Sequence, residues 1–146
     1  MRIIPFLLLV LLAGHSSSAF GQAGRPNEGQ PVDIIMGERT ITAVINDSSA
    51  GSNFLEMLPL PLTMARLYDR EYYTALPKTL AVSEPPVKDY QIGDIAYWPD
   101  WNYIGILFSK TRPLSSPVII LGRVTSGLEI FEDMGSEIDL IFQARP

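Results

Sequence analysis

Cysteine is absent from the 146-residue sequence, and histidine occurs only once, at position 15. A chain without cysteine has no disulfides, so its fold has to be stabilised by packing. Histidine and cysteine also carry the chemistry of Ser–His–Asp triads, Cys–His dyads and the usual zinc sites. These classes of site are excluded if His15 is not part of the folded domain.

Motifs for other ligands are missing as well. The sequence contains no D-x-D-x-D-G calcium loop, no G-x-S-x-G or S-x-x-K nucleophile motif, and no G-x-G-x-x-G or P-loop pattern. Most hydrolytic and nucleotide-dependent reactions therefore lack the residues that would perform them. We expect no metal and no cofactor.

Positive charge is scarce and is not clustered in a basic patch. Lys and Arg number 11 against 16 Asp and Glu, which gives a formal net charge of −5. Proteins that bind nucleic acid concentrate basic side chains against the phosphates. We therefore expect no nucleic-acid partner.

The first residues have the pattern of a signal peptide. Arg2 precedes an apolar segment, residues 3–13, and small residues follow at positions 19, 21 and 23. The apolar segment is shorter than the roughly 20 residues that span a bilayer. This pattern predicts a signal peptide over residues 1–23, in which either Ala19 and Gly21 or Gly21 and Ala23 could fill the positions that a signal peptidase reads.

Cleavage after Ala23 would remove His15, so the mature domain would have neither histidine nor cysteine. Because the sequence contains no cysteine, a lipid anchor on cysteine is excluded, and we expect no membrane anchor. The protein is predicted to be exported, either periplasmic or secreted, with a flexible lead-in at residues 24–31 and one domain at residues 32–146.

Short strand patterns separated by turn residues fill most of that domain. Ile41, Ala43 and Ile45 alternate with threonine and valine, which is typical of a half-buried strand, and Gly37 begins a two-residue hairpin turn before it. The expected strands cover residues 32–36, 39–45, 60–68, 71–74, 104–108, 118–125 and 137–144. Many short strands of this kind predict an all-β barrel or sandwich.

Two short helices are expected between the strands. Residues 46–48 are helix-capping types, apolar residues then recur at helical spacing, and Pro59 ends the pattern. A second helix is predicted to begin at a capping box, Ser126 with Glu129, and to run to about Met134.

The aromatic residues gather in one stretch, residues 93–108. Tyr97, Trp98, Trp101 and Tyr103 lie within seven residues, and both tryptophans of the chain are among them. Such a stretch either packs in a core or lines a groove. Pro99 interrupts the alternation, so the sequence leaves open which way the two tryptophans face.

Four stretches together resemble the cyclophilin-like domains, and most closely the small bacterial members of unassigned function. They are Asn53-Phe54 with Leu55 and Leu58, then Gly93–Tyr97, then Ile106–Phe108, and finally Ile120–Val124 followed by Ser126–Leu128. The resemblance implies a closed barrel of about eight mostly antiparallel strands, with a short helix capping each end.

The resemblance extends to only one residue of the cyclophilin catalytic set. Prolyl isomerases of that family use an arginine in an F-H-R motif, and Met64-Ala65-Arg66 stands at that place. The family's histidine, tryptophan and glutamine are replaced here by Val118, Pro113 and Ile106 (or Gly105 after a shift of one residue). Arg66 is therefore the single candidate catalytic residue.

Two functions are compatible with these patterns. The first is a binding module without bond-making chemistry, for a Pro-containing peptide or a small molecule, because aromatic residues and arginine are enriched at binding hot spots. The second is a peptidyl-prolyl cis-trans isomerase in which Arg66 donates to the prolyl nitrogen. The candidate ligand-binding residues are Met64, Arg66, Tyr97, Trp98, Trp101, Tyr103 and Phe108.

Overall fold

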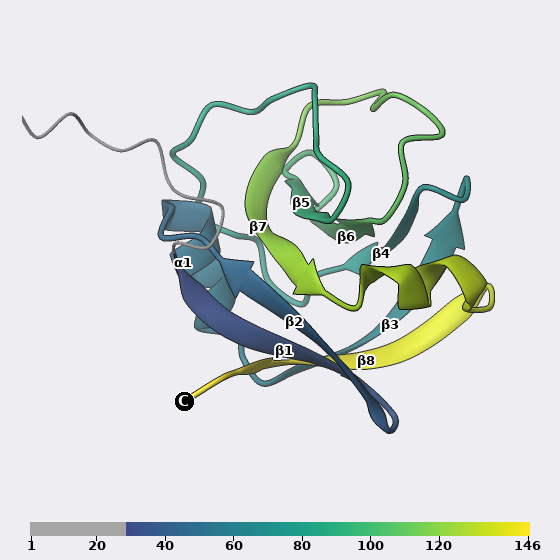
Figure 1. Cartoon of the computed structure of the whole chain (residues 1–146). Coiled ribbons are helices and arrows are strands. Elements are labelled where there is room, and N and C mark those ends of the chain that lie inside the picture. The colour runs from purple at the N-terminus through teal and green to yellow at the C-terminus, as the bar shows by residue number, and fades with distance from the viewer. Residues whose placement is uncertain (1–28) are drawn as a thin grey trace, which may run out of the picture.

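The structure, a computed structural model, describes residues 29–146 and consists mainly of one closed barrel of eight antiparallel strands (Figure 1). The order of the strands around the barrel is β1-β2-β7-β5-β6-β4-β3-β8. Their bounds are β1 Gln30–Met36, β2 Arg39–Ile45, β3 Leu60–Leu67, β4 Glu71–Ala75, β5 Asp94–Trp98, β6 Tyr103–Leu107, β7 Ile119–Ser126 and β8 Glu137–Ala144. The all-β closed barrel expected from the sequence is confirmed.

The expected signal peptide, residues 1–23, lies outside the described residues, as does most of the lead-in at 24–31. Gln30 and Pro31, at the end of that lead-in, already belong to β1, where Gln30 pairs with Ile45 of β2. None of the helices between residues 29 and 146 has the length and apolar character needed to cross a membrane.

Alternation along each strand fills the inside of the barrel. Ile41, Ala43 and Ile45 of β2 are buried in the core, as their spacing predicts. Opposite them on β1, Val32 and Ile34 are fully buried. The turn between the two strands is formed by Gly37 and Glu38, and Gly37 has a φ of 57°, which glycine adopts without strain. The predicted hairpin is present.

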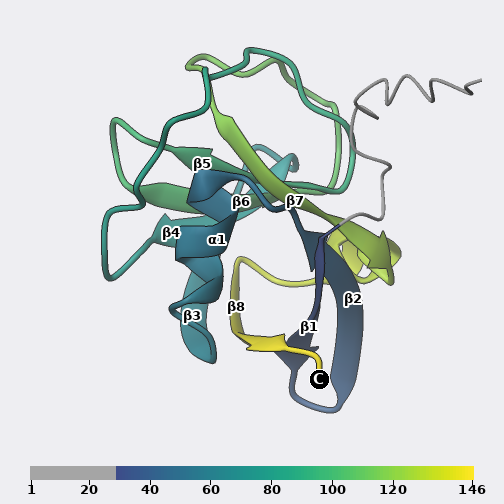
Figure 2. The ribbon, with the colours of Figure 1, turned by 90° about the vertical axis from the view of Figure 1, so that its left-hand side faces the viewer.

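The two short helices lie at opposite sides of the barrel and cover its open ends (Figure 1); Figure 2 views the end covered by α1. In α1 (Ser49–Leu55) Ser48 is the N-cap, and its Oγ accepts a hydrogen bond from the N–H of Gly51 at 3.0 Å. Phe54 is fully buried and packs edge-on against Phe142 of β8, with ring centroids 5.3 Å apart. The helix ends three residues earlier than the pattern up to Leu58 suggested.

The second helix differs from the prediction in type and in its start. It is a 3₁₀-helix, η1 (Leu128–Asp133), and its N-cap is Gly127 at a φ of 86°, with no side-chain cap. Ser126 does not form the predicted capping box, because it is the last residue of β7 and its hydroxyl bonds to Thr42 of β2. Strand pairing thus uses the hydroxyl that the sequence pattern assigned to the helix.

Two long connections cover part of the outside of the barrel. Residues 76–93 and 108–118 run next to each other along one side, where Val87 and Val118 form an isolated β-bridge (Figure 1). Beneath them a second apolar cluster lies on the outer face of β5, β6 and β7; its buried members are Tyr90, Ala96, Trp98, Leu107 and Val118. This side of the barrel is therefore apolar both inside and outside.

Candidate functional site

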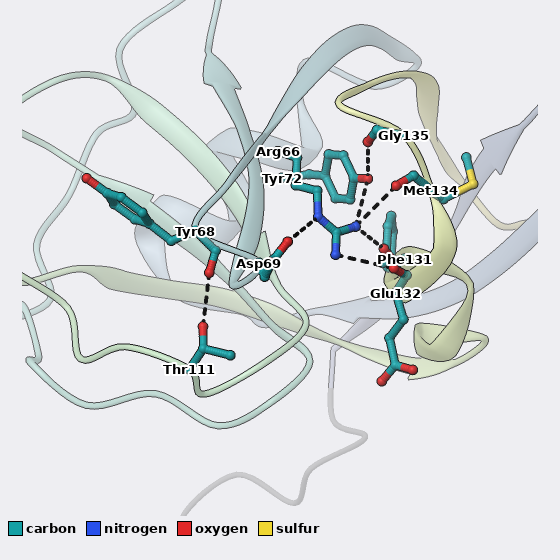
Figure 3. Close-up of polar contacts among 9 residues, drawn as sticks. All are labelled: Arg66, Tyr68, Asp69, Tyr72, Thr111, Phe131, Glu132, Met134 and Gly135. Atoms are coloured by element: carbon teal, nitrogen blue, oxygen red, sulfur yellow. Dashed lines mark hydrogen bonds and ion pairs between the residues drawn. The ribbon is translucent and has the colours of Figure 1, made fainter.

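Arg66, the candidate catalytic residue, lies on β3 and reaches the end of the barrel that η1 covers (Figure 3). Its guanidinium donates five hydrogen bonds, and each of its three nitrogens has at least one partner among the described residues. The partners are the Asp69 carboxylate at 2.9 Å, the Tyr72 hydroxyl at 3.2 Å, and the carbonyl oxygens of Phe131 at 2.8 Å, Glu132 at 3.2 Å and Met134 at 3.2 Å.

Three of these five contacts satisfy carbonyl groups at the end of η1, where the last carbonyl groups of a helix have no partner within it. The guanidinium also lies over the ring of Phe108, with Cζ 4.8 Å from the ring centroid. The hydrogen bond with Tyr72 is the main reason why the pKa of Arg66 is raised above its usual value, and the contact with Asp69 adds to it. Arg66 thus fastens η1 to β3 and β4.

An arginine on a barrel strand commonly reaches solvent or pairs with a nearby carboxylate. The structure pairs Arg66 with Asp69, three residues further along the chain. Glu71 is instead the partner of Arg70, with Nη2 and Oε1 2.6 Å apart.

Three other candidate ligand-binding residues lie inside the barrel. Met64 and Tyr97 are fully buried in the main core, and Phe108 is 5% exposed and packs against Phe131. The hydroxyl of Tyr97 donates to the side chain of Asn102 at 2.9 Å, which fixes the turn after β5. Because these side chains support the core, a ligand on the surface does not reach them.

The remaining three candidates come together on the outside of the barrel. Trp98, Trp101 and Tyr103 line a surface groove of about 340 Å³, which we call the aromatic groove. Its other lining residues come from β3, β4, the turn between them and the connection after β6: Leu67, Tyr68, Arg70, Glu71, Tyr73 and Ser115. The volume is at the lower end of the range of small-ligand sites.

The floor and walls of the aromatic groove follow from the alternation on three neighbouring strands. Tyr97 points inward, so Trp98 points outward, and its indole lies next to Gly105 on β6; a Cβ at position 105 would come within 2.8 Å of the ring. Tyr73 of β4 and Tyr103 of β6 pack together with ring centroids 5.5 Å apart. A larger residue at position 105 would push the indole away, so the glycine makes room for this wall.

One end of the aromatic groove is formed by the β3–β4 turn. Tyr68 and Asp69 both have positive φ values, 55° and 50°, and Tyr68 is 54% exposed. The carbonyl of Tyr68 accepts a hydrogen bond from Thr111 at 3.0 Å, which ties the turn to the 108–118 connection (Figure 3). The guanidinium of Arg112 lies 4.4 Å from the Tyr68 ring centroid on the same side of the molecule.

A buried ion pair lies at the base of the aromatic groove. Arg70 is 6% exposed and Glu71 2%, and Arg70 Nη1 also donates to the carbonyl of Pro113 at 2.8 Å. Burial raises the pKa of Glu71 above its usual value, although the Arg70 guanidinium partly opposes the shift. The charges of the pair offset each other, so the base of the groove is polar without a net charge.

A family model described as the cyclophilin-like family matches residues 34–143. The chain belongs to the cyclophilin-like family. The solution structure of a hypothetical protein from Archaeoglobus fulgidus has a similar fold, with a TM-score of 0.67, 18% identity, and coverage of 84% of this chain and 99% of that one. No curated protein matches the sequence.

Membership of the cyclophilin-like family accounts for the barrel and does not assign an activity. Residues 29–146 hold no cluster of three or more histidine, cysteine, aspartate or glutamate side chains suited to a metal ion. The polar groups available to a ligand in the aromatic groove are those of Arg70, Glu71, Ser115 and the tyrosines. This set suits recognition through hydrogen bonds and ring contacts.

The sequence pattern identified three of the five aromatic residues of this groove, Trp98, Trp101 and Tyr103, from their density along the chain. It missed Tyr68 of the β3–β4 turn and Tyr73 of β4, which come about 30 residues earlier. A signal for Tyr73 was present, because in the pattern Glu71–Thr74 its position alternates with Tyr72 and places it on the outer face.

We predict that Arg66→Met destabilises this cyclophilin-like domain by about 2–4 kcal/mol, because several carbonyl groups at the end of η1 lose their donor. Urea unfolding followed by circular dichroism measures the change. Arg39→Met, at an exposed position on β2, is the matched control and should stay within about 0.5 kcal/mol of the unmodified protein. Equal stability of the two variants would show that Arg66 does not fasten η1.

Proposed function

We propose that this cyclophilin-like protein binds a short, proline-containing peptide in the aromatic groove and performs no bond-making chemistry. The observation that carries the proposal is the set of five aromatic side chains that line one groove outside the core: Tyr68, Tyr73, Trp98, Trp101 and Tyr103. Flat aromatic surfaces are what proline rings pack against in the peptide-binding domains that recognise proline-rich segments.

The exposure of the groove residues supports binding over simple packing. Trp101 is 52% exposed and Tyr103 36%, so much of their ring surface is available to a partner. Trp98 is 7% exposed and is held by the outer apolar cluster, which makes it a rigid wall. Rigid aromatic residues lose little side-chain entropy on binding and are enriched at hot spots.

The contacts of Arg66 argue against the alternative, a prolyl isomerase with Arg66 as donor. Such a reaction lowers a rotation barrier of roughly 18–20 kcal/mol by donation to the prolyl nitrogen. In this protein, Nε, Nη1 and Nη2 of Arg66 already donate to protein acceptors at 2.8–3.2 Å, at the end of the barrel covered by η1. Arg66 is also not among the residues that line the aromatic groove.

Peptide binding is tested by titrating the protein with fluorescein-labelled peptides that differ in one residue, Ala-Ala-Pro-Ala and Ala-Ala-Ala-Ala, and measuring anisotropy. We expect the proline peptide to bind more tightly, and Trp101→Ala to weaken its binding about tenfold because an exposed aromatic wall is lost.

The control for this variant is Ile92→Ala, which removes an exposed apolar side chain, 51% exposed, that does not line the groove. It should bind the peptide as the unmodified protein does. Equal binding of both peptides, or an equal loss in both variants, would contradict recognition of proline in this groove. Binding of small metabolites and of no peptide would instead favour a small-molecule carrier.

Isomerase activity is tested separately, with a protease-coupled assay on Xaa-Pro peptides. We expect the rate of isomerisation to equal the uncatalysed rate, because the guanidinium of Arg66 already donates to protein acceptors and does not line the aromatic groove. An acceleration that survives in Arg39→Met and disappears in a folded Arg66→Lys variant would establish the enzyme and overturn the binding-only proposal. Circular dichroism shows whether that variant is folded.

We also propose that the protein is exported, on the strength of the pattern at residues 1–23. Expression of the full chain in a bacterium and intact-mass spectrometry of the periplasmic fraction test this. A mature N-terminus at Gly24 is the expected result. A full-length chain that remains in the cytoplasm would contradict it.

A further inference from the structure

A second hollow adjoins the aromatic groove at the β3–β4 turn. It has a volume of about 360 Å³, and we call it the arginine pocket; it is lined by Tyr68, Arg70, Arg112, Pro113 and Ser115. Three of these residues, Tyr68, Arg70 and Ser115, also line the aromatic groove, so the two hollows share a wall. A ligand that occupies the aromatic groove therefore lies next to Arg112.

Arg112 supplies the uncompensated charge of the arginine pocket. The charge of Arg70 is offset by Glu71, whereas among residues 29–146 no carboxylate lies within 4 Å of the Arg112 guanidinium. That guanidinium lies over the ring of Tyr68, with Cζ 4.4 Å from the ring centroid. A guanidinium in this position uses its face for the ring and keeps the N–H donors of its edge for an acceptor.

The backbone that carries Arg112 is held at three successive residues. The hydroxyl of Thr111 donates to a carbonyl of the β3–β4 turn at 3.0 Å (Figure 3). The carbonyl of Arg112 accepts from the hydroxyl of Tyr90 at 3.2 Å, and the carbonyl of Pro113 accepts from Nη1 of Arg70 at 2.8 Å. Because this segment is already fixed, a ligand that binds Arg112 does not have to order it, which lowers the entropic cost of binding.

The two connections on this side of the barrel carry more positive than negative charge, although the chain as a whole has a formal net charge of −5. The basic residues of segments 76–93 and 108–118 are Lys78, Lys88, Lys110 and Arg112, and the acidic ones are Glu84 and Asp89. Both acidic side chains are already engaged, Glu84 with Ser49 and Asp89 with Lys110. An anionic group is therefore attracted to this side in preference to the rest of the surface.

We propose that the arginine pocket binds a carboxylate of the peptide whose proline lies in the aromatic groove, with Arg112 as the donor. One guanidinium carries one charge, which a carboxylate balances and a phosphate dianion exceeds. The inference rests on the proposed function, because the two hollows adjoin, and it specifies a peptide that is acidic next to its proline. The carboxylate belongs either to an Asp or Glu side chain or to the C-terminus of the peptide.

The arginine pocket is tested first with three small probes, benzoate, benzamide and phenyl phosphate, in NMR titrations of the ¹⁵N-labelled unmodified protein. We expect benzoate to bind about fivefold more tightly than benzamide at low ionic strength and to shift the Nε–H resonance of Arg112. The difference should shrink at high ionic strength, because salt screens exposed charges. Equal affinities of benzoate and benzamide, or tighter binding of phenyl phosphate than of benzoate, would overturn the proposal.

A variant locates the effect at Arg112. Arg112→Gln removes the charge, so benzoate and benzamide should bind about equally. Because the bond from Tyr90 goes to the carbonyl of Arg112, the substitution leaves that bond in place. Lys78→Gln makes the same change of charge at an exposed position that lines neither hollow, and it should keep the preference for benzoate. An equal loss of preference in both variants would show general attraction of anions and contradict a site at Arg112.

Acetylated peptides separate the two sources of the carboxylate. Ala-Glu-Pro-Ala and Ala-Ala-Pro-Glu, both with amidated ends, are compared with the same peptides carrying Gln in place of Glu. Ala-Ala-Pro-Ala is compared with a free and with an amidated C-terminus. Tighter binding of either Glu peptide assigns a side-chain carboxylate, and tighter binding of the free acid assigns the C-terminus. Binding that is the same within all three pairs would overturn the proposal.

The same measurements distinguish failure of this inference from failure of the proposed function. A preference for benzoate that depends on Arg112, without binding of any peptide, would support the arginine pocket and contradict peptide recognition. A preference for proline over alanine in the peptides, without any preference for a carboxylate, would do the reverse.

Discussion

Closure of the eight-stranded barrel determines the face on which each residue of this protein lies. In a closed sheet one face is the packed core and the other is the surface, so neighbouring residues on a strand have opposite surroundings. Tyr97 supports the core while Trp98 forms a wall outside it, and Tyr72 packs inside while Tyr73 contacts Tyr103 outside. One aromatic-rich segment therefore supplies both the core and the aromatic groove.

The same constraint explains why Arg66 has a structural role. Met64 lies in the core, so Arg66, two residues further along β3, is on the inward-facing side where the barrel ends. An arginine at that place needs acceptors, and the short helix η1 offers carbonyl groups that have none of their own. The cation and the helix end satisfy each other, which leaves the guanidinium engaged away from the aromatic groove.

The sequence predicted the barrel well because period-two patterns, such as Ile41, Ala43 and Ile45, and the Ser48 cap are local signals. It predicted the site less well. Because Pro99 interrupts the alternation, the sequence did not show which way Trp98 faces. Tyr68 of the β3–β4 turn and Glu71 of β4 are distant in sequence from Trp98 and come next to it only when β4 pairs with β6. Ser126 was assigned to a helix cap because its bond to Thr42 depends on the pairing of β2 with β7.

The Arg70–Glu71 pair is buried where the β3–β4 turn meets the 108–118 connection. Removing these two charges from water costs desolvation free energy. The hydrogen bond from Arg70 to the Pro113 carbonyl and the contact between Arg70 and Glu71 offset only part of it. Where a core needs only stability, apolar side chains of similar size would serve as well or better. The pair and its contact with Pro113 therefore hold the β3–β4 turn against the 108–118 connection beside the aromatic groove.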